Sequence, residues 1–115
     1  MIKLRRAYDP PKDDDGKKYL VDRLWPRGVK KENLKVEGWL KEIAPSDTLR
    51  KSFHATEDWP EFEKRYRKEL KDKTAQLAEI KKLEKQHKKV TLLFGRKEEK
   101  QNQAVVLAEI LKGKK

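Results

Sequence analysis

The residues best suited to chemistry in this 115-residue chain are three arginines that accompany apolar segments. Arg23 and Arg27 lie in and just after the segment Tyr19–Trp25, and Arg96 follows the run Val90–Phe94. Guanidinium groups bind phosphate and carboxylate oxygens in bidentate geometry. If both segments are parallel strands, their carboxyl ends meet at the sheet edge where α/β domains bind ligands. We therefore expect these arginines to bind a small anion.

Asp22 shares the first of these segments, which has apolar residues on both faces of the expected strand. A buried, ionised carboxylate needs a partner, because burial disfavours the charged form. We therefore predict that Asp22 is buried and paired with an arginine or with backbone donors. An alternative stays open in which Arg23 only neutralises Asp22 or another acid, and Arg27 is an ordinary loop residue between Pro26 and Gly28.

Ser46, Arg50 and His54 are spaced four residues apart, which places them on one side of an expected helix. This spacing brings an imidazole near an anion-binding guanidinium, so His54 is a weak catalytic candidate. No partner acid or thiol is indicated, and packing beside Phe53 or capping explains His54 better. No other catalytic residue is assigned. The predicted ligand-binding set is Asp22, Arg23, Trp25, Arg27, Ser46, Arg50, Arg96 and Asn102.

The apolar pattern that must position these residues predicts strands alternating with helices. The expected strands are 2–8, 19–25 and 90–94, and the expected helices are 36–43, a short helix after Ser46, 58–70, a Lys-rich helix after a break near 72–74, and 104–111. This order predicts an α/β fold with a small parallel or mixed sheet of about three strands, flanked by helices, in one domain spanning residues 1–115.

Lys and Arg number 31 against 20 Asp and Glu, which gives a formal net charge of +11. Such an excess attracts phosphate-rich partners. Nucleic-acid binding through the Lys-rich helix and the basic tail is therefore the alternative function. The same charges also suit an ordinary solvated surface.

Several classes of protein are excluded by composition. There is no Cys, so no disulfide, thiolate nucleophile or thiolate metal site forms. The acidic run Asp13–Asp15 lacks the alternating spacing of a calcium loop and reads as a solvated turn. No apolar run approaches the roughly 20 residues of a membrane span. We expect a cytoplasmic protein with no metal, cofactor or membrane partner, and the oligomeric state is not predicted.

Several runs resemble the YeaO-like family, domain of unknown function 488. They are Ala7-Tyr8-Asp9-Pro10, residues 20–31, residues 39–46, Leu49-Arg50, Phe53-His54 and residues 59–70. The string Asp-Arg-Leu-Trp-Pro-Arg-Gly at 22–28 is highly specific, and the likeness covers nearly the whole chain. The resemblance implies an α/β domain with no established reaction.

Longer relatives in that broader family carry a Cys-His-Arg motif where the helix after the last strand begins. Asn102, Gln103 and Ala104 stand there in this chain. Asn cannot act as a thiolate, so chemistry that depends on that Cys is unavailable here. Asn102 either contacts a ligand or caps the helix, and the cap is favoured.

We therefore expect a small α/β domain that binds an anionic, phosphate-like or nucleotide-like ligand at the carboxyl edge of the sheet. Whether it is an enzyme is left open by the sequence.

Overall fold

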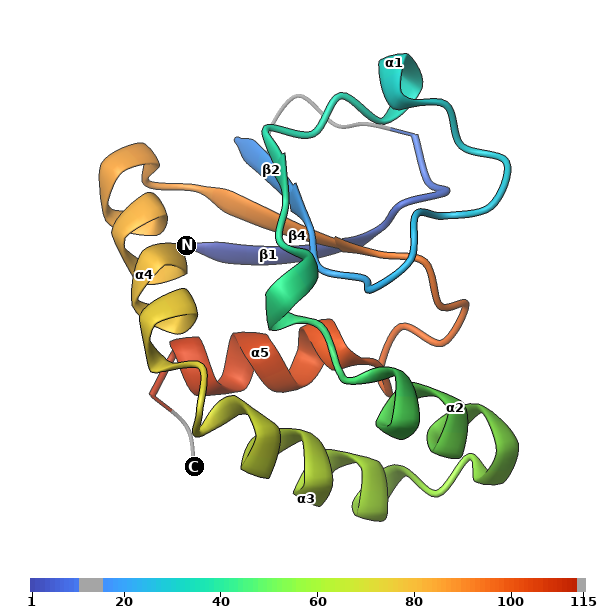
Figure 1. The fold of residues 1–115 in the computed structure, drawn as a ribbon. Helices are drawn as coiled ribbons and strands as arrows, with labels where there is room; N and C mark the ends of the chain where they lie inside the picture. Colours follow the sequence, from blue (N-terminus) through green and yellow to red (C-terminus); the bar gives the residue numbers. More distant parts are fainter. Residues whose placement is uncertain (11–15, 114–115) are drawn as a thin grey trace.

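A parallel β-sheet with the strand order β1-β4-β2-β3 organises the chain, and the computed structural model describes residues 1–10 and 16–113 of it (Figure 1). Its elements are β1 (Ile2–Arg6), β2 (Lys17–Leu20), α1 (Lys31–Leu34), β3 (Gly38–Trp39), the 3-10 helix η2 (Lys41–Ile43), α2 (Asp47–Thr56), α3 (Trp59–Leu70), α4 (Thr74–His87), β4 (Val90–Phe94) and α5 (Gln103–Leu111). The predicted α/β fold is confirmed.

Strand β4 is buried along its whole length, which explains its continuous apolar sequence. It pairs in parallel with β1 on one side and with β2 on the other. Val90, Leu92 and Phe94 join the larger hydrophobic core, which helices α2 to α5 complete. Leu93 points to the opposite face and joins a smaller core with Leu34 of α1. The two-residue period of the strand thus gives the sheet two covered faces.

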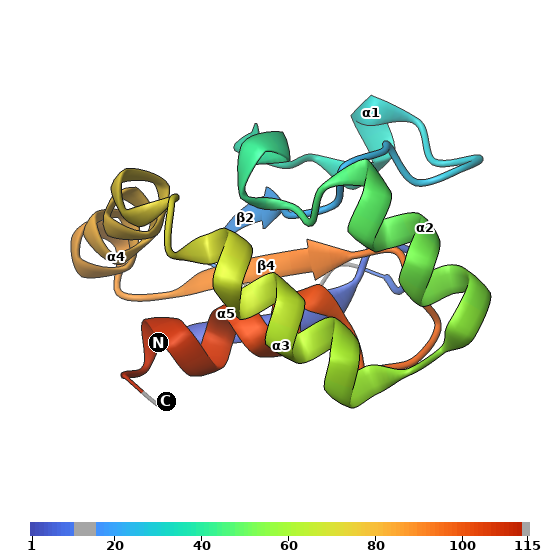
Figure 2. The same cartoon turned by 60° about the horizontal axis from the view of Figure 1, so that its bottom comes forward.

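Helices α2, α3, α4 and α5 confirm the predicted helical segments. Ser46 caps α2 by accepting a hydrogen bond from Leu49 N, and Asp58 caps α3 in the same way from Glu61 N. Helices α3 and α5 lie side by side on one face of the sheet (Figures 1 and 2). Arg67 of α3 bridges them, because its guanidinium lies 2.9 Å from Glu109 of α5.

The predicted helix over 36–43 is wrong. The chain forms the short strand β3 there and then η2. Gly38 weakens a helix, and pairing with β2 satisfies the local backbone instead. Leu40 N donates to Leu20 O at 2.8 Å and Glu37 N donates to Lys18 O at 2.8 Å. Tertiary pairing therefore overrides the helical spacing of the apolar residues.

The predicted strand over 19–25 is too long at its carboxyl end. Strand β2 ends at Leu20, after which Val21 N still donates to Leu93 O at 3.0 Å. Asp22 and the residues that follow it leave the sheet as a loop. The two segments are parallel strands, the condition set above for their carboxyl ends to meet, since Tyr19 and Leu20 pair with Leu92 and Leu93.

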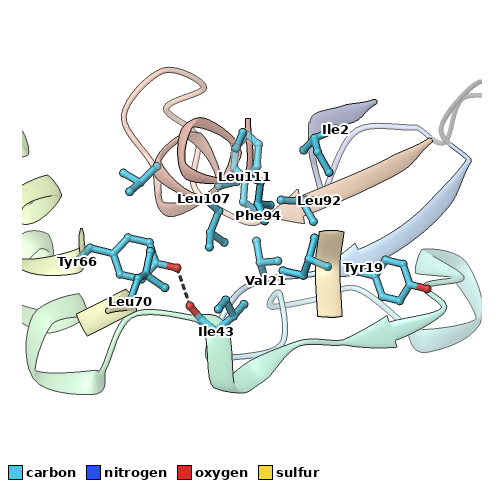
Figure 3. Close-up of a cluster of buried hydrophobic side chains, with 14 of the residues drawn as sticks. Ile2, Tyr19, Val21, Ile43, Tyr66, Leu70, Leu92, Phe94, Leu107 and Leu111 are labelled. Carbon is cyan, nitrogen blue, oxygen red and sulfur yellow. Dashed lines mark hydrogen bonds between the residues drawn. The ribbon is translucent and has the colours of Figure 1, made fainter. Parts of the chain in front are cut away.

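The segment 43–46, between η2 and α2, is attached to α3 by polar contacts. The hydroxyl of Tyr66, which is fully buried, donates to the Ile43 carbonyl at 2.6 Å (Figure 3). One turn later, Glu69 accepts from Ser46 N at 2.9 Å and from Ser46 Oγ at 2.5 Å. These bonds fix the backbone between Ile43 and Ser46 relative to the helical layer.

Replacing Tyr66 with Phe removes the hydroxyl while keeping the ring, so the Ile43 carbonyl loses a buried donor. We expect the free energy of unfolding to fall by about 1–2 kcal/mol in urea denaturation. Tyr19→Phe is the matched control, because Tyr19 is also buried but its hydroxyl makes no hydrogen bond to any described residue. Its loss should stay within about 0.5 kcal/mol. Equal losses in the two variants would contradict the role given to the Tyr66 hydroxyl.

Candidate functional site

Among the described residues, a pocket of about 630 Å³ opens at the carboxyl end of the parallel sheet. Residues 22–27 after β2, residues 95–97 after β4 and Tyr8 after β1 form part of its wall. The side chains of Arg50, Phe53 and His54 on α2, and of Glu57 directly after it, form another part, and Gln103 lies at the start of α5. The pocket therefore occupies the position at which open α/β sheets bind ligands.

Arg23 lines this pocket and is oriented by backbone carbonyls rather than by a carboxylate. Its Nε donates to Pro45 O at 2.8 Å, and one Nη donates to Ala44 O at 3.2 Å. Arg23 forms no ion pair with any described residue. The alternative in which it only neutralises Asp22 is therefore wrong for the described part of the chain. The two carbonyls hold the guanidinium plane and leave its remaining N–H groups without an acceptor among the described residues.

The predicted pairing of Asp22 with a backbone donor is confirmed, but the residue is half-buried and not fully buried. Its Oδ2 accepts from Gly95 N at 2.7 Å, and its Oδ1 accepts from the side-chain amide of Gln103. Burial raises the pKa of Asp22 from 3.8 to about 6, against the lowering effect of these two hydrogen bonds. The hydrogen bonds stabilise the anion but do not fully replace the water that burial removes.

Arg50 and Arg96 add positive charge on the α2 side of the pocket. The guanidinium of Arg96 lies 4.3 Å from the centre of the Phe53 ring and 3.1 Å from a carboxylate oxygen of Glu57. Arg50 reaches Asp47 at 3.5 Å, a long and exposed contact. The Nε atoms of Arg50 and Arg96 are both buried without a hydrogen-bond partner among the described residues. Both arginines line the pocket, so their positive charge attracts an anion that enters it.

Tyr8, Trp25 and Arg27 line the pocket on the segments that follow β1 and β2. The Tyr8 hydroxyl donates to Arg27 O at 3.0 Å, which joins the segments after β1 and β2. Trp25 donates its indole N–H to Val29 O at 2.6 Å and packs edge-on against Trp39, with ring centres 5.5 Å apart. The Arg27 side chain is exposed, so it reaches the pocket mouth without a structural constraint.

The structure brings together most of the predicted site residues and separates two of them. Asp22, Arg23, Trp25, Arg27, Arg50, Arg96 and the weak catalytic candidate His54 all line the pocket. Ser46 does not line it and serves as the cap of α2 and the partner of Glu69. Asn102 is fully buried and caps α5 by accepting from Val105 N at 3.1 Å, as the favoured alternative predicted. His54 is exposed and has no polar partner among the described residues.

Sequence reasoning missed Tyr8, Gln103 and Glu57 as pocket residues. Tyr8 was the easiest of these to predict, because it follows a strand whose carboxyl end lies at the same sheet edge. Gln103 contacts Asp22 across 81 positions of sequence, a pairing that no local pattern reveals. Its amide is positioned because Asn102 starts helix α5 directly before it.

Within residues 1–10 and 16–113, no three His, Asp or Glu side chains gather in a way that could hold a metal ion. The run Asp13–Asp15 lies outside the described residues. None of the helices in the same two ranges combines the length and the apolar character that crossing a bilayer requires.

The raised pKa of Asp22 makes the stability of the fold depend on pH. Because the pKa of Asp22 is higher in the folded state than in the unfolded state, protonation of Asp22 stabilises the fold. This stabilisation is complete below about pH 4 and is lost as the pH rises through about 6. We expect the stability of the wild type relative to Asp22→Asn to fall by about 1–3 kcal/mol between pH 4 and pH 7. Urea denaturation of both proteins across this range measures the difference. A difference that stays constant or rises with pH would contradict the burial of this carboxylate.

Comparison with known proteins gives relatives but no activity. The chain is 44% identical to the uncharacterised protein YeaO of Escherichia coli (strain K12), over 96% of each chain. It is 39% identical to the uncharacterised protein Rv3073c of Mycobacterium tuberculosis (strain ATCC 25618 / H37Rv), over 98% of this chain and 95% of the relative. No solved structure gives a significant match.

A family model described as the inactive DUF488-N3 subclade matches residues 1–115. This match and the similarity to YeaO over nearly the full chain confirm the resemblance found in the sequence. The Asn-Gln-Ala sequence at 102–104 supplies a helix cap in Asn102, a partner for Asp22 in Gln103 and a core residue in Ala104. The chain belongs to the inactive DUF488-N3 subclade of the YeaO-like proteins.

Proposed function

We propose that this protein is a non-catalytic binding domain that takes a small anionic, phosphate-like or nucleotide-like ligand in the pocket at the carboxyl edge of the sheet. The observation that carries the proposal is the state of Arg23. Its guanidinium is half-buried, is held by the carbonyls of Ala44 and Pro45, and has no carboxylate partner among the described residues. A partly desolvated cation without a counter-ion gains more from an incoming anion than a fully solvated one does.

The charge around Arg23 supports the same ligand class. Among the described residues, five cationic side chains line the pocket, namely Arg23, Arg27, Arg50, Arg96 and Lys97, against the two carboxylates of Asp22 and Glu57. The volume of about 630 Å³ lies within the usual range for small-molecule sites. The net charge of +11 adds a long-range field that favours the approach of anions.

The description of the family as inactive supports binding over catalysis. His54 lacks a polar partner that would orient its ring, and Gln103 cannot exchange a proton near neutral pH. Both oxygens of Asp22 already accept hydrogen bonds from the protein. These side chains suit the recognition of a ligand.

Anion binding is tested by ligand-induced changes in melting temperature, with inorganic phosphate, pyrophosphate and nucleoside 5′-monophosphates as probes. At least one probe should raise the melting temperature of the wild type, because a ligand that binds only the folded state stabilises it. For that probe, Arg23→Gln and Arg27→Ala should each raise Kd by about tenfold or more, as expected for the loss of a charge-assisted hydrogen bond. Calorimetric titration gives the Kd values.

Lys68→Ala is the matched control, since it removes one positive charge from an exposed position on α3 outside the pocket. Its Kd should stay near that of the wild type. Melting temperatures without ligand separate lost binding from lost folding. No shift with any probe, or an equal loss of affinity in Lys68→Ala, would refute the proposed site.

Nucleic-acid binding through the Lys-rich helix α4 is the competing function. Lys81, Lys82, Lys85, Lys88 and Lys89 are all exposed, but no Trp, Tyr or Phe is interleaved with them to stack on bases. Glu79 and Glu84 also interrupt the positive charge along this helix. A protein that binds along a nucleic-acid backbone needs a continuous positively charged surface, and the charge on α4 is interrupted.

Changing these five lysines to Gln separates the two functions. We expect the variant to keep the wild-type affinity for the small anion that binds the pocket. If α4 instead bound nucleic acid, the affinity of the wild type for duplex DNA would fall steeply with salt. On a log-log plot the slope would be about −0.9 per phosphate contacted, and the variant would show a smaller slope. Sub-micromolar DNA binding at physiological salt that disappears in the variant would favour the competing function. Fluorescence anisotropy with a labelled duplex makes the measurement.

A further inference from the structure

The two sides of the pocket differ in chemistry, which bears on the kind of anion it accepts. Arg50 and Arg96 line the α2 side, and the guanidinium of Arg23 is held nearby by the backbone that leads into α2. What we call the aromatic side is the lining contributed by the segments after β1 and β2, where Tyr8, Leu24 and Trp25 accompany Arg27. A bare inorganic anion uses only the cationic side.

The aromatic side is exposed although it is built from large apolar groups. Tyr8 is 46% exposed and Leu24 is 55% exposed, and they are two of the four large apolar residues that are exposed in the described part of the chain. Exposed apolar groups gathered at a pocket are typical of a surface that a ligand covers. Tyr8 is also fixed in place, because its hydroxyl is bonded to Arg27 O. A fixed, exposed ring can stack on a planar ligand with little loss of side-chain entropy.

Gly95 brings the edge of this ring next to the hydrogen-bonding groups of Asp22. A methyl group at the Cβ position of Gly95 would lie 2.9 Å from Asp22 Oδ2 and 3.8 Å from Cε2 of Tyr8. The Asp22 carboxylate and the edge of the Tyr8 ring therefore both lie close to the position that a side chain at Gly95 would occupy. Each oxygen of Asp22 keeps a second lone pair beside the hydrogen bond that it already accepts, and the Gln103 amide keeps its oxygen and its second N–H. Such a pair can bond to the N–H and carbonyl edge of a heterocycle.

We propose that the anion bound in this pocket carries a nitrogenous base, as a nucleoside monophosphate does. The base stacks on Tyr8 with its edge toward Asp22 and Gln103, and the phosphate binds the guanidinium of Arg23. This inference rests on the proposed anion-binding function and narrows its ligand class. It assigns base recognition to Tyr8, a residue that the charge pattern alone does not select.

Calorimetric titration at fixed pH and ionic strength tests the inference with three kinds of probe: the four common ribonucleoside 5′-monophosphates, ribose 5-phosphate and inorganic phosphate. At least one nucleotide should bind about tenfold or more tightly than ribose 5-phosphate, the range expected for stacking of one base on one aromatic ring. The sugar phosphate carries the same charged group, so this ratio isolates the base.

Variants of Tyr8 locate the preference. Tyr8→Leu should bring the affinity for the nucleotide close to that for ribose 5-phosphate while leaving the latter unchanged. Tyr8→Phe keeps the ring and should retain most of the preference, although it lacks the bond to Arg27 O. The melting temperature of each variant without ligand verifies folding.

The outcomes separate the two proposals. Equal binding of all nucleotides and ribose 5-phosphate would overturn the base preference while supporting anion binding. A nucleotide preference that survives in Tyr8→Leu would overturn the assignment of the base to Tyr8. Failure of all three kinds of probe to bind would overturn the anion-binding function together with the inference.

Discussion

The geometry of the pocket depends on how the backbone between Ile43 and Ser46 is held between helix α3 and Arg23. On one side, Tyr66 and Glu69 of α3 bond to Ile43 and Ser46. On the other side, the carbonyls between these two residues accept from the Arg23 guanidinium. The helical layer thereby sets the position of a charged group that belongs to the loop after β2. Since Ser46 also caps the start of α2, the same four residues fix the position of α2 relative to Arg23.

This arrangement has an energetic consequence for Arg23. Backbone carbonyls satisfy part of its hydrogen-bonding capacity but contribute no full negative charge, whereas a carboxylate partner would neutralise it. Among the described residues, Asp22 and Glu57 are the carboxylates of the pocket wall. Asp22 accepts hydrogen bonds from Gly95 and Gln103, and Glu57 pairs with Arg96. The positive charge of Arg23 therefore has no counter-ion among the described residues, and it lies at a half-buried position where an anionic ligand can pair with it. A fixed cation of this kind favours binding because little side-chain entropy remains to be lost.

Much of the fold was predictable from sequence, and the failures have physical causes. The run Val90–Phe94 and the periodic segments that became α2, α3, α4 and α5 follow from apolar spacing and capping residues. The convergence of Arg23, Arg27 and Arg96 follows from the rule for parallel strands. The helix expected over 36–43 failed because hydrogen bonds to β2, a long-range feature, decided the backbone. For the same reason the carbonyl partners of Arg23 and the contact between Asp22 and Gln103 were not predictable, and Ser46 was assigned to the ligand although it serves the fold.

The state of the Arg23 side chain can be observed directly by NMR of arginine Nε–H groups in the ¹⁵N-labelled protein, free and titrated with nucleoside 5′-monophosphates. If two carbonyls hold the guanidinium as described, the Arg23 Nε–H signal should be resolved in the free protein and exchange slowly with water, because this proton is bonded to Pro45 O. It should then shift on addition of the nucleotide, with a concentration dependence that matches the calorimetric Kd. A signal in the free protein that exchanges as fast as those of exposed arginines, or one that stays unchanged at saturating nucleotide, would contradict the central role given to Arg23.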